Sequence, residues 1–237
     1  KFIMSNKSVT CNIIGWALLL ILISGCKKYL DVVPDNVATL ENAFTVRTQA
    51  QKFLATCYSY MPRNGDFGSD PATQGGDEIW RIITNGGNMF NIARGLMNST
   101  NPYGDNWQQM YRALRDCNIF LENIDKVADM ESPEKARWAS EVKFLKAYYH
   151  FVLVRMYGPS RLGKENLPIW ATPEEVKVMR DPVDSCFNYI TQLIDESLEY
   201  LPMEINDPIN ELGRITVPIA LSIKAKVLVA APSPLYN

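Results

Sequence analysis

Apolar residues recur at intervals of three and four along much of the chain, which is the spacing of one buried face on an α-helix. Proline and glycine interrupt this pattern, for example at Gly158-Pro159 and at Pro202. The pattern predicts an all-α (mainly) fold with helices at residues 39–60, 106–129, 132–157, 181–201 and 217–231. Helices of this length with short connections fit tetratricopeptide-like hairpins and a plain helical bundle equally well.

The expected helix starts differ in the strength of their capping residues. Ser132-Pro133 places a cap residue and then a proline at the start of the third helix. Thr39 with Asn42 is a weaker start for the first helix, and Asp181 opens the fourth. Residues 159–179 have no helical period and are expected to form a loop.

Between the first two helices the periodic pattern is lost, over residues 64–105. This insertion is rich in Gly and Asn and also carries the aromatic residues Phe67, Trp80, Phe90 and Tyr103. A long loop in a compact domain is usually functional or disordered, and aromatic residues are unusual in disordered linkers. We therefore expect residues 64–105 to form an ordered surface.

The first residues have the order of a bacterial lipoprotein signal. Lys7 precedes an apolar run over residues 13–23, and Ile23-Ser24-Gly25-Cys26 matches a lipobox. The run is shorter than the roughly 20 residues of a membrane-spanning helix and fits the apolar region of a signal peptide. We expect residues 1–25 to be the signal peptide, with Met4 as its start, and residues 26–38 to be a tether lipidated at Cys26. A chance cysteine after a secretory signal and an uncleaved helix are the alternatives.

Composition and charge narrow the possible functions. The 24 basic and 26 acidic residues leave a net charge of −2, so the chain lacks the basic excess of a non-specific nucleic-acid binder. Beyond Cys26 the cysteines are Cys57, Cys117 and Cys186, an odd number at wide spacing, which favours neither a disulfide framework nor a zinc site. Cys57 and Cys117 lie on apolar helix stripes and are expected to be buried free thiols. We expect no metal and no cofactor.

The sequence offers no convincing catalytic motif. His150, the single histidine, lies within a helix among aromatic residues and is expected to be a packed, hydrogen-bonded core residue. The segment from Gly158 to Lys164 has most of a P-loop spacing, but it follows a helix and continues with Glu165 instead of Ser or Thr. Asp77 and Glu78 are adjacent, so their sequence positions do not place them on opposite sides of a glycosidic bond.

The order of several segments resembles the SusD/RagB family of outer-membrane nutrient-binding lipoproteins. Residues 26–34 resemble the family's lipidated Cys followed by "fLd..P", and residues 107–118 its "W..lY..i..aN" helix. Residues 141–158 resemble "E.rfLRA.yyf.L...yG", and residues 180–202 the stretch that ends in Leu-Pro. Residues 213–237 resemble "GR.t..aA.al.akv.L.aaSPlyn". One departure is Pro159-Ser160-Arg161-Leu162, where the family usually has Val-Pro-Leu after Tyr-Gly.

The resemblance implies an outer-membrane, cell-surface lipoprotein that captures oligosaccharide or, in some members, peptide. It implies a SusC-type TonB-dependent transporter as partner, contact with the membrane through the lipid anchor only, no nucleic acid, no cofactor and no catalysis. Family members are about twice as long or more, so residues 39–237 are expected to be the N-terminal helical domain without the family's C-terminal half.

The ligand-binding residues are expected in the 64–105 insertion, at Trp80, Arg81, Asn85 and Asp77. In the protein that gives the family its name, a Trp and an Asn of the corresponding early loop contact the glycan, and this general location is what carries over. Trp80 lies between an acidic pair and Arg81, near glycines that let a ligand approach. A packed Trp80 is the alternative. Trp107, Tyr111 and Asn118 share one helix face and are expected to be structural, with Asn118 satisfying a buried backbone group.

Two other functions remain open at this point. A structural interaction protein would bind partner segments through its helical hairpins and pack its aromatic residues internally. A glycan-processing enzyme would use Asp77 or Glu78, and it is the less favoured of the two.

Overall fold

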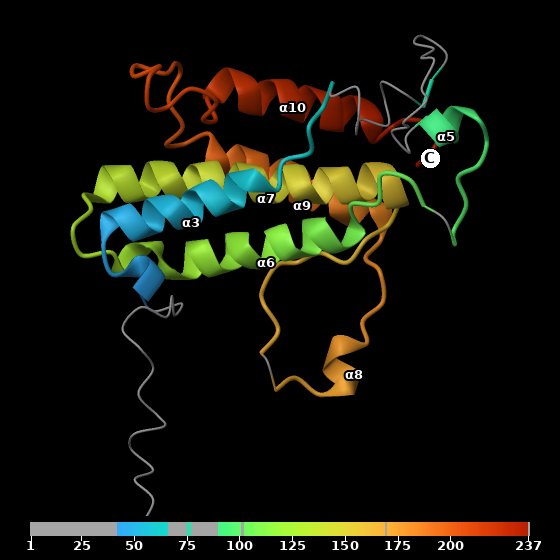
Figure 1. Ribbon diagram of the computed structural model, residues 1–237, viewed down its shortest axis with the longest axis horizontal. Coiled ribbons are helices and arrows are strands. Elements are labelled where there is room, and N and C mark those ends of the chain that lie inside the picture. The colour runs from blue at the N-terminus through green and yellow to red at the C-terminus, as the bar shows by residue number, and fades with distance from the viewer. Residues whose placement is uncertain (1–41, 66–74, 77–89, 101, 169, 237) are drawn as a thin grey trace, which may run out of the picture. The chain divides into compact units, whose positions relative to one another are not determined.

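The computed structural model describes residues 42–65, 75–76, 90–100, 102–168 and 170–236, and from residue 40 onward the chain forms one compact unit. Within the described residues the regular elements are helices, and none is a β-strand (Figure 1). The longer helices are α3 (Arg47–Ser59), α6 (Trp107–Asn123), α7 (Ser132–Tyr157), α9 (Val183–Ser197) and α10 (Val217–Ala230). The short ones are η1 (Asn42–Phe44), α5 (Phe90–Ala93), η2 (Ile124–Lys126) and α8 (Pro173–Val176).

The helix α7 is the centre of the bundle. It packs against α6 and α9 and also contacts α3 and α10, while each long helix contacts the next one along the chain (Figure 1). Nearly all of residues 138–154 are buried, on every side of the helix, which explains why α7 is apolar on more than one face. By contrast, α6 and α9 each bury one apolar face. Successive hairpins of this kind confirm the predicted mainly α, tetratricopeptide-like fold.

Two helix starts and one helix cap differ from the expected ones. The first long helix begins at Arg47, well after residue 39, because Val46 is extended (φ −137°, ψ 153°) and separates η1 from α3. In α7 the N-cap position belongs to Glu131, so Ser132 is already inside the helix. The fourth helix begins at Val183 with Pro182 as its N-cap, and Asp181 lies in the irregular segment before it, where its N–H donates to the carbonyl of Ser160.

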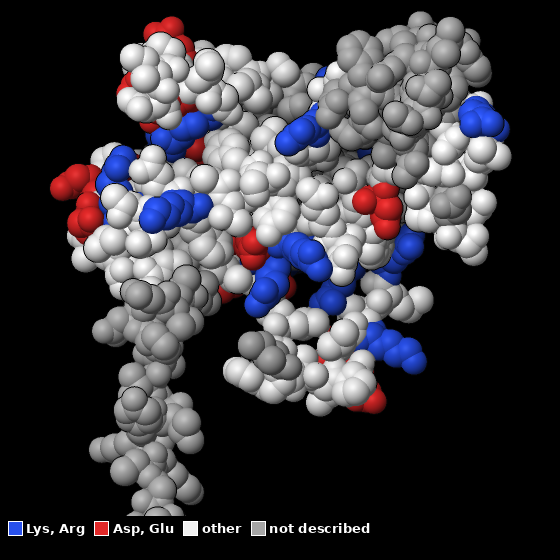
Figure 2. Space-filling view, in the orientation of Figure 1, with Lys and Arg blue, Asp and Glu red and all other residues white. Residues whose placement is uncertain are grey.

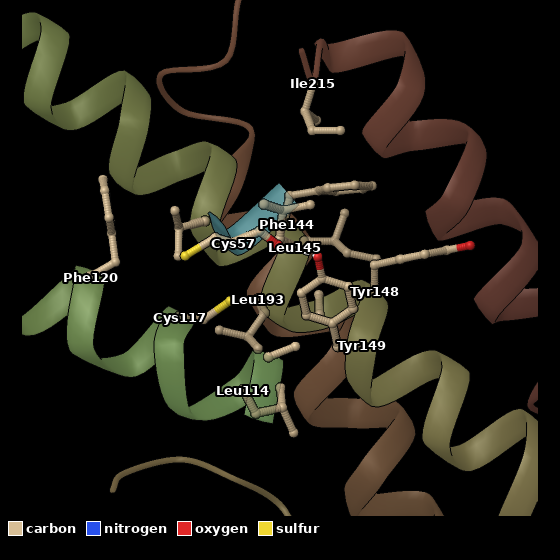
Figure 3. Packing of buried hydrophobic residues seen from close by; sticks show 14 of the residues in the cluster. Cys57, Leu114, Cys117, Phe120, Phe144, Leu145, Tyr148, Tyr149, Leu193 and Ile215 are labelled. Carbon is tan, nitrogen blue, oxygen red and sulfur yellow. Dashed lines mark hydrogen bonds between the residues drawn. The ribbon is translucent and has the colours of Figure 1, made fainter. Parts of the chain in front are cut away.

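The core contains free thiols, as expected. Cys57, Cys117 and Cys186 are all reduced and fully buried. The side chains of Cys57 on α3 and Cys117 on α6 lie close together among Leu114, Phe120 and Tyr149 (Figure 3). Burial is the main cause that raises the pKa of the Cys117 thiol, and contact with Cys57 raises it further. The thiol is therefore kept in its unreactive protonated form.

None of the described helices combines the length and the apolar character needed to cross a membrane.

Candidate functional site

The residues predicted from sequence to bind ligand lie outside the described part of the chain. Trp80, Arg81, Asn85 and Asp77 belong to residues 77–89, and the lipidation site Cys26 belongs to residues 1–41. Their roles stay predictions. Two other surfaces among the described residues have the shape and the polar groups of a binding site.

The larger of these surfaces, which we call the α3 groove, is a cavity of about 660 Å³ between α3 and the segment that precedes α10. Its polar walls include Gln51 and Ser59 on one side and Asp207 and Asn210 on the other. Leu54 and Leu212 contribute apolar surface. A cavity of this size falls within the usual range for small-molecule sites.

Below the α3 groove lies a buried carboxylate with several partners. Glu141 has no exposed surface, and its side chain receives Arg214 Nε at 3.0 Å and the Tyr58 hydroxyl at 2.7 Å on one oxygen. The other oxygen lies 3.2 Å from Arg137 Nε and 2.8 Å from an Arg214 terminal nitrogen. Burial raises the pKa of Glu141, while Arg214, Tyr58 and Arg137 oppose that rise.

The charged residues around the groove neutralise one another. Glu211 pairs with Arg137 at 2.9 Å and with Arg214 at 2.7 Å, and Arg47 pairs with Glu134 at 2.6 Å. Asp207 accepts hydrogen bonds from Ile209 N–H and from Asn210, so it stabilises its own turn. Because these carboxylates are already paired or hydrogen-bonded, the groove is suited to binding a polar molecule and poorly suited to proton transfer.

The second surface is built around residues 160–167, which we call the 160–167 segment. Three buried polar side chains bind its backbone. Asn118 Nδ2 donates to the Gly163 carbonyl at 3.2 Å, and Lys146 Nζ donates to the Lys164 carbonyl at 2.9 Å. His150 Nε2 accepts the Gly163 N–H at 3.0 Å, so its Nδ1 is the donor to the Lys146 carbonyl.

Further hydrogen bonds fix the same segment. The Tyr111 hydroxyl donates to the Arg161 carbonyl at 3.1 Å, and Asp181 accepts the Leu162 N–H at 2.8 Å. Asn166 donates to the Arg115 carbonyl at 3.1 Å. A Cβ on Gly163 would lie 3.3 Å from Leu114, closer than nearly all real contacts, so the segment approaches α6 as closely as its backbone permits.

These contacts confirm two expectations. His150 is a fully buried, hydrogen-bonded core histidine, and desolvation lowers its pKa to about 4. Asn118 does satisfy a buried backbone carbonyl. Trp107 packs edge-on against Tyr111 and Tyr157, with ring centroids 4.9 Å and 5.1 Å away, which agrees with its structural role. Among the described residues no cluster of His, Cys, Asp or Glu could hold a metal ion.

Comparison with known proteins places the chain in a family. A family described as "Starch-binding associating with outer membrane", one of the SusD-like families, matches residues 28–228, which is most of the chain. The chain belongs to this SusD-like family.

Individual relatives are distant and longer. The chain is 24% identical to SusD-like protein P25 of Formosa agariphila over 91% of its own length and 42% of that protein. A SusD-like protein of Bacteroides fragilis superposes with a TM-score of 0.65 at 24% identity, covering 78% of this chain and 35% of the other. A laminarin-binding SusD-like protein superposes at 0.64 and 22% identity, covering 78% and 40%. The chain therefore spans about two fifths of these SusD-like proteins or less.

Residues of the segments that carry the SusD-like resemblance make contacts at both surfaces. Glu141, from the segment at residues 141–158, contacts Arg214, from the segment at residues 213–237, below the α3 groove. Asn118, from the segment at residues 107–118, contacts the 160–167 segment. The resemblance thus marks residues that hold both surfaces in shape.

One exposed aromatic residue of this SusD-like chain was not predicted. Residues 170–180, which we call the α8 loop, project from the bundle, and the chain returns to it at Asp181 (Figure 1). Trp170 on this loop is 83% exposed, and Met179 is 91% exposed. Thr172 and Glu175 form a capping box that starts α8. The spacing Thr-x-x-Glu was the available signal for this short helix.

Proposed function

We propose that this chain belongs to a cell-surface lipoprotein that captures oligosaccharide and passes it to a SusC-type TonB-dependent transporter in the outer membrane. The observation that carries the proposal is the match of residues 28–228 to a family described as starch-binding and associated with the outer membrane. Proteins of similar fold include a laminarin-binding SusD-like protein and a surface glycan-binding protein of Bacteroides uniformis. Capture without catalysis also fits the α3 groove, where the carboxylates are paired with cations or hydrogen-bonded.

Two tryptophans are the proposed platforms for sugar rings. Trp80 keeps the role expected from its position in the 64–105 insertion. Trp170 is added because its side chain is 83% exposed, which leaves a large apolar surface in contact with water unless a ligand covers the ring. A sugar ring has an apolar face that can stack on such an indole, while its hydroxyl groups bind amides and charged groups.

The test is binding of laminarin and starch by affinity electrophoresis and calorimetry. Replacing Trp170 with Ala, or Trp80 with Ala, should weaken binding roughly tenfold for about 1.4 kcal/mol of lost stacking. Met179→Ala is the matched control, because it removes an exposed apolar side chain from the same loop without removing a ring. The proposal would be contradicted if the protein bound neither polysaccharide and no other glycan in a broad panel.

The lipid anchor is a separate part of the proposal and has its own test. Cys26→Ser removes the thiol that would carry the diacylglycerol, so cells should accumulate an unprocessed precursor of higher mass. Processing of the Ser variant at the normal rate would show that Cys26 is not the modified residue.

A second candidate function is docking of a protein partner, and α10 favours it. Most residues of this helix are apolar, yet it buries only Ala220 and Val227 completely and leaves Leu228 and Val229 52% and 75% exposed. An exposed apolar row of this kind marks an interaction surface. Tryptophan fluorescence that no glycan alters, together with co-purification of a β-barrel protein, would favour this function over glycan capture.

A further inference from the structure

The arginines of the two surfaces differ in their partners. Around the α3 groove, Arg47, Arg137 and Arg214 all pair with carboxylates. Beside the 160–167 segment, Arg115 and Arg161 line a pocket of about 260 Å³, and neither is paired with a carboxylate of the described residues. The pocket thus presents two guanidinium groups that form no ion pair with a described residue.

A third guanidinium lies close to the same place. Arg180 sits over the Trp107 ring, 5.1 Å from its centroid, and donates to the carbonyls of Tyr157 and Pro159 at 3.2 and 3.3 Å. Burial raises the pKa of Tyr111, which lines the pocket, while the charges of Arg161 and Arg180 oppose that rise. The charges of both guanidinium groups therefore reach the pocket wall.

The nearby carboxylates do not cancel this charge. Asp181 is held by the Leu162 N–H, and Asp116 accepts the Tyr60 hydroxyl at 2.7 Å. Glu165 also lines the pocket and is exposed, as is Arg115, so the lining carries two guanidinium groups against one carboxylate. In Figure 2, Lys and Arg side chains gather on the side of the molecule where α6 faces the α8 loop.

The pocket is also preorganised. The backbone of the 160–167 segment is held by Asn118, Lys146 and His150, so the main chain that carries Arg161 is fixed before a ligand arrives. Guanidinium groups in fixed positions form paired hydrogen bonds with the planar or tetrahedral oxygens of a carboxylate or sulfate. The remaining walls are the amides of Asn118 and Asn166 and the apolar side chains of Leu114 and Leu167, which suit a sugar ring.

We infer that this pocket, formed by Arg115, Arg161 and the 160–167 segment, is a subsite for one acidic unit of an oligosaccharide that carries carboxylate or sulfate groups. Its volume lies below the roughly 300–1,000 Å³ of sites for drug-sized ligands, so it holds a single unit of a longer chain. Trp170 is three residues beyond Leu167 and therefore within about 11 Å of it along the chain, where its ring can stack on the next unit. The inference rests on the proposed glycan-binding function and adds the chemical class of the glycan.

The test compares polysaccharides that share a backbone and differ in charge. Polygalacturonate and its methyl ester form one pair, and sulfated and unmodified laminarin form the other. Affinity electrophoresis should show at least tenfold tighter binding of the charged member in one of the pairs, and rising salt should reduce that preference. The net charge of −2 for the whole chain argues against attraction of any polyanion to the surface at large.

The variants assign the preference to the pocket. Arg161→Gln and Arg115→Gln should abolish it, so that each variant binds the charged member no more tightly than the uncharged one. Arg155→Gln is the control, because Arg155 is exposed on α7, forms no ion pair with a described residue, and lies away from the pocket lining. Circular dichroism and urea unfolding of each variant confirm that it is folded.

The outcomes separate this inference from the proposed function. Binding of uncharged laminarin or starch with no preference in either pair overturns the acidic subsite and leaves glycan capture standing. A preference that survives both Arg161→Gln and Arg115→Gln also overturns the subsite. Failure to bind any member of the two pairs, or starch, overturns both.

Discussion

Lowering the pH from 7 to 5 should destabilise the protein through His150, its only histidine. In the native state the neutral ring accepts the Gly163 N–H at Nε2 and donates to the Lys146 carbonyl from Nδ1. Protonation of Nε2 removes the acceptor and places a charge in a fully buried site beside the Lys146 ammonium group. Desolvation, aided by the Lys146 charge, therefore lowers the pKa to about 4, against about 6.5 in the unfolded chain.

The size and direction of the effect follow from this difference. Because the pKa is lower in the folded protein, the unfolded chain binds more protons between pH 6.5 and pH 4, and stability falls as the pH drops through that window. The His150 contribution is fully present above pH 6.5. With these two pKa values, about 2 kcal/mol of it is lost by pH 5 and about 3 kcal/mol by pH 4.

Two measurements test this prediction. Urea unfolding of the parent and of His150→Gln, whose amide can accept and donate in similar directions but does not titrate, should diverge as the pH falls from 7 to 5. The free-energy difference between the two proteins cancels the titration of the other groups. An NMR titration of the single imidazole should give a pKa near 4. Parallel unfolding free energies for the two proteins across pH 5–7, or an imidazole that titrates near 6.5, would refute the argument.

Two further predictions concern buried polar groups. Asn118→Leu leaves the Gly163 carbonyl and the Asn166 side chain without a donor and should cost about 1–3 kcal/mol of unfolding free energy; an unchanged urea midpoint would mean that these bonds contribute nothing. Glu141→Ala leaves Arg137 and Arg214 without their buried counter-charge and should cost about 3–5 kcal/mol of unfolding free energy. Glu196→Ala, which breaks the exposed pair with Lys143, should cost less than about 1 kcal/mol. Equal effects of the two variants would refute the distinction.

The predictability of the fold followed the strength of local signals. The helix expected at residues 132–157 was found with those bounds, because Pro133 and Gly158 mark its ends and its apolar residues are dense. The first helix was expected to begin at residue 39, but it begins at Arg47 because the extended backbone of Val46, which apolar spacing does not reveal, interrupts it. Free buried thiols and a core histidine were predicted correctly because both depend on the helix face they occupy.

The two candidate surfaces were harder to foresee, because each joins residues that are distant in the chain. Glu141 and Arg214 are separated by 73 positions, and nothing local to either residue shows that they form a pair. The exposure of Trp170 depends on how the α8 loop leaves the bundle, which the composition of residues 159–179 does not fix. The expected ligand residues Trp80, Arg81, Asn85 and Asp77 lie outside the described residues, so they remain predictions.

The arrangement of buried polar residues indicates where this bundle needs a fixed shape. Burying Asn118, Lys146 or His150 is costly unless each finds a partner, and an apolar residue at any of these positions would avoid that cost. All three instead bind the backbone of one short segment, at Gly163 and Lys164. By contrast with the 160–167 segment, whose backbone is bound by buried side chains, residues 172–180 are all exposed. In the proposed function, the fixed backbone of the 160–167 segment would hold one unit of a polymer in place, while the exposed residues 172–180 would meet the neighbouring units.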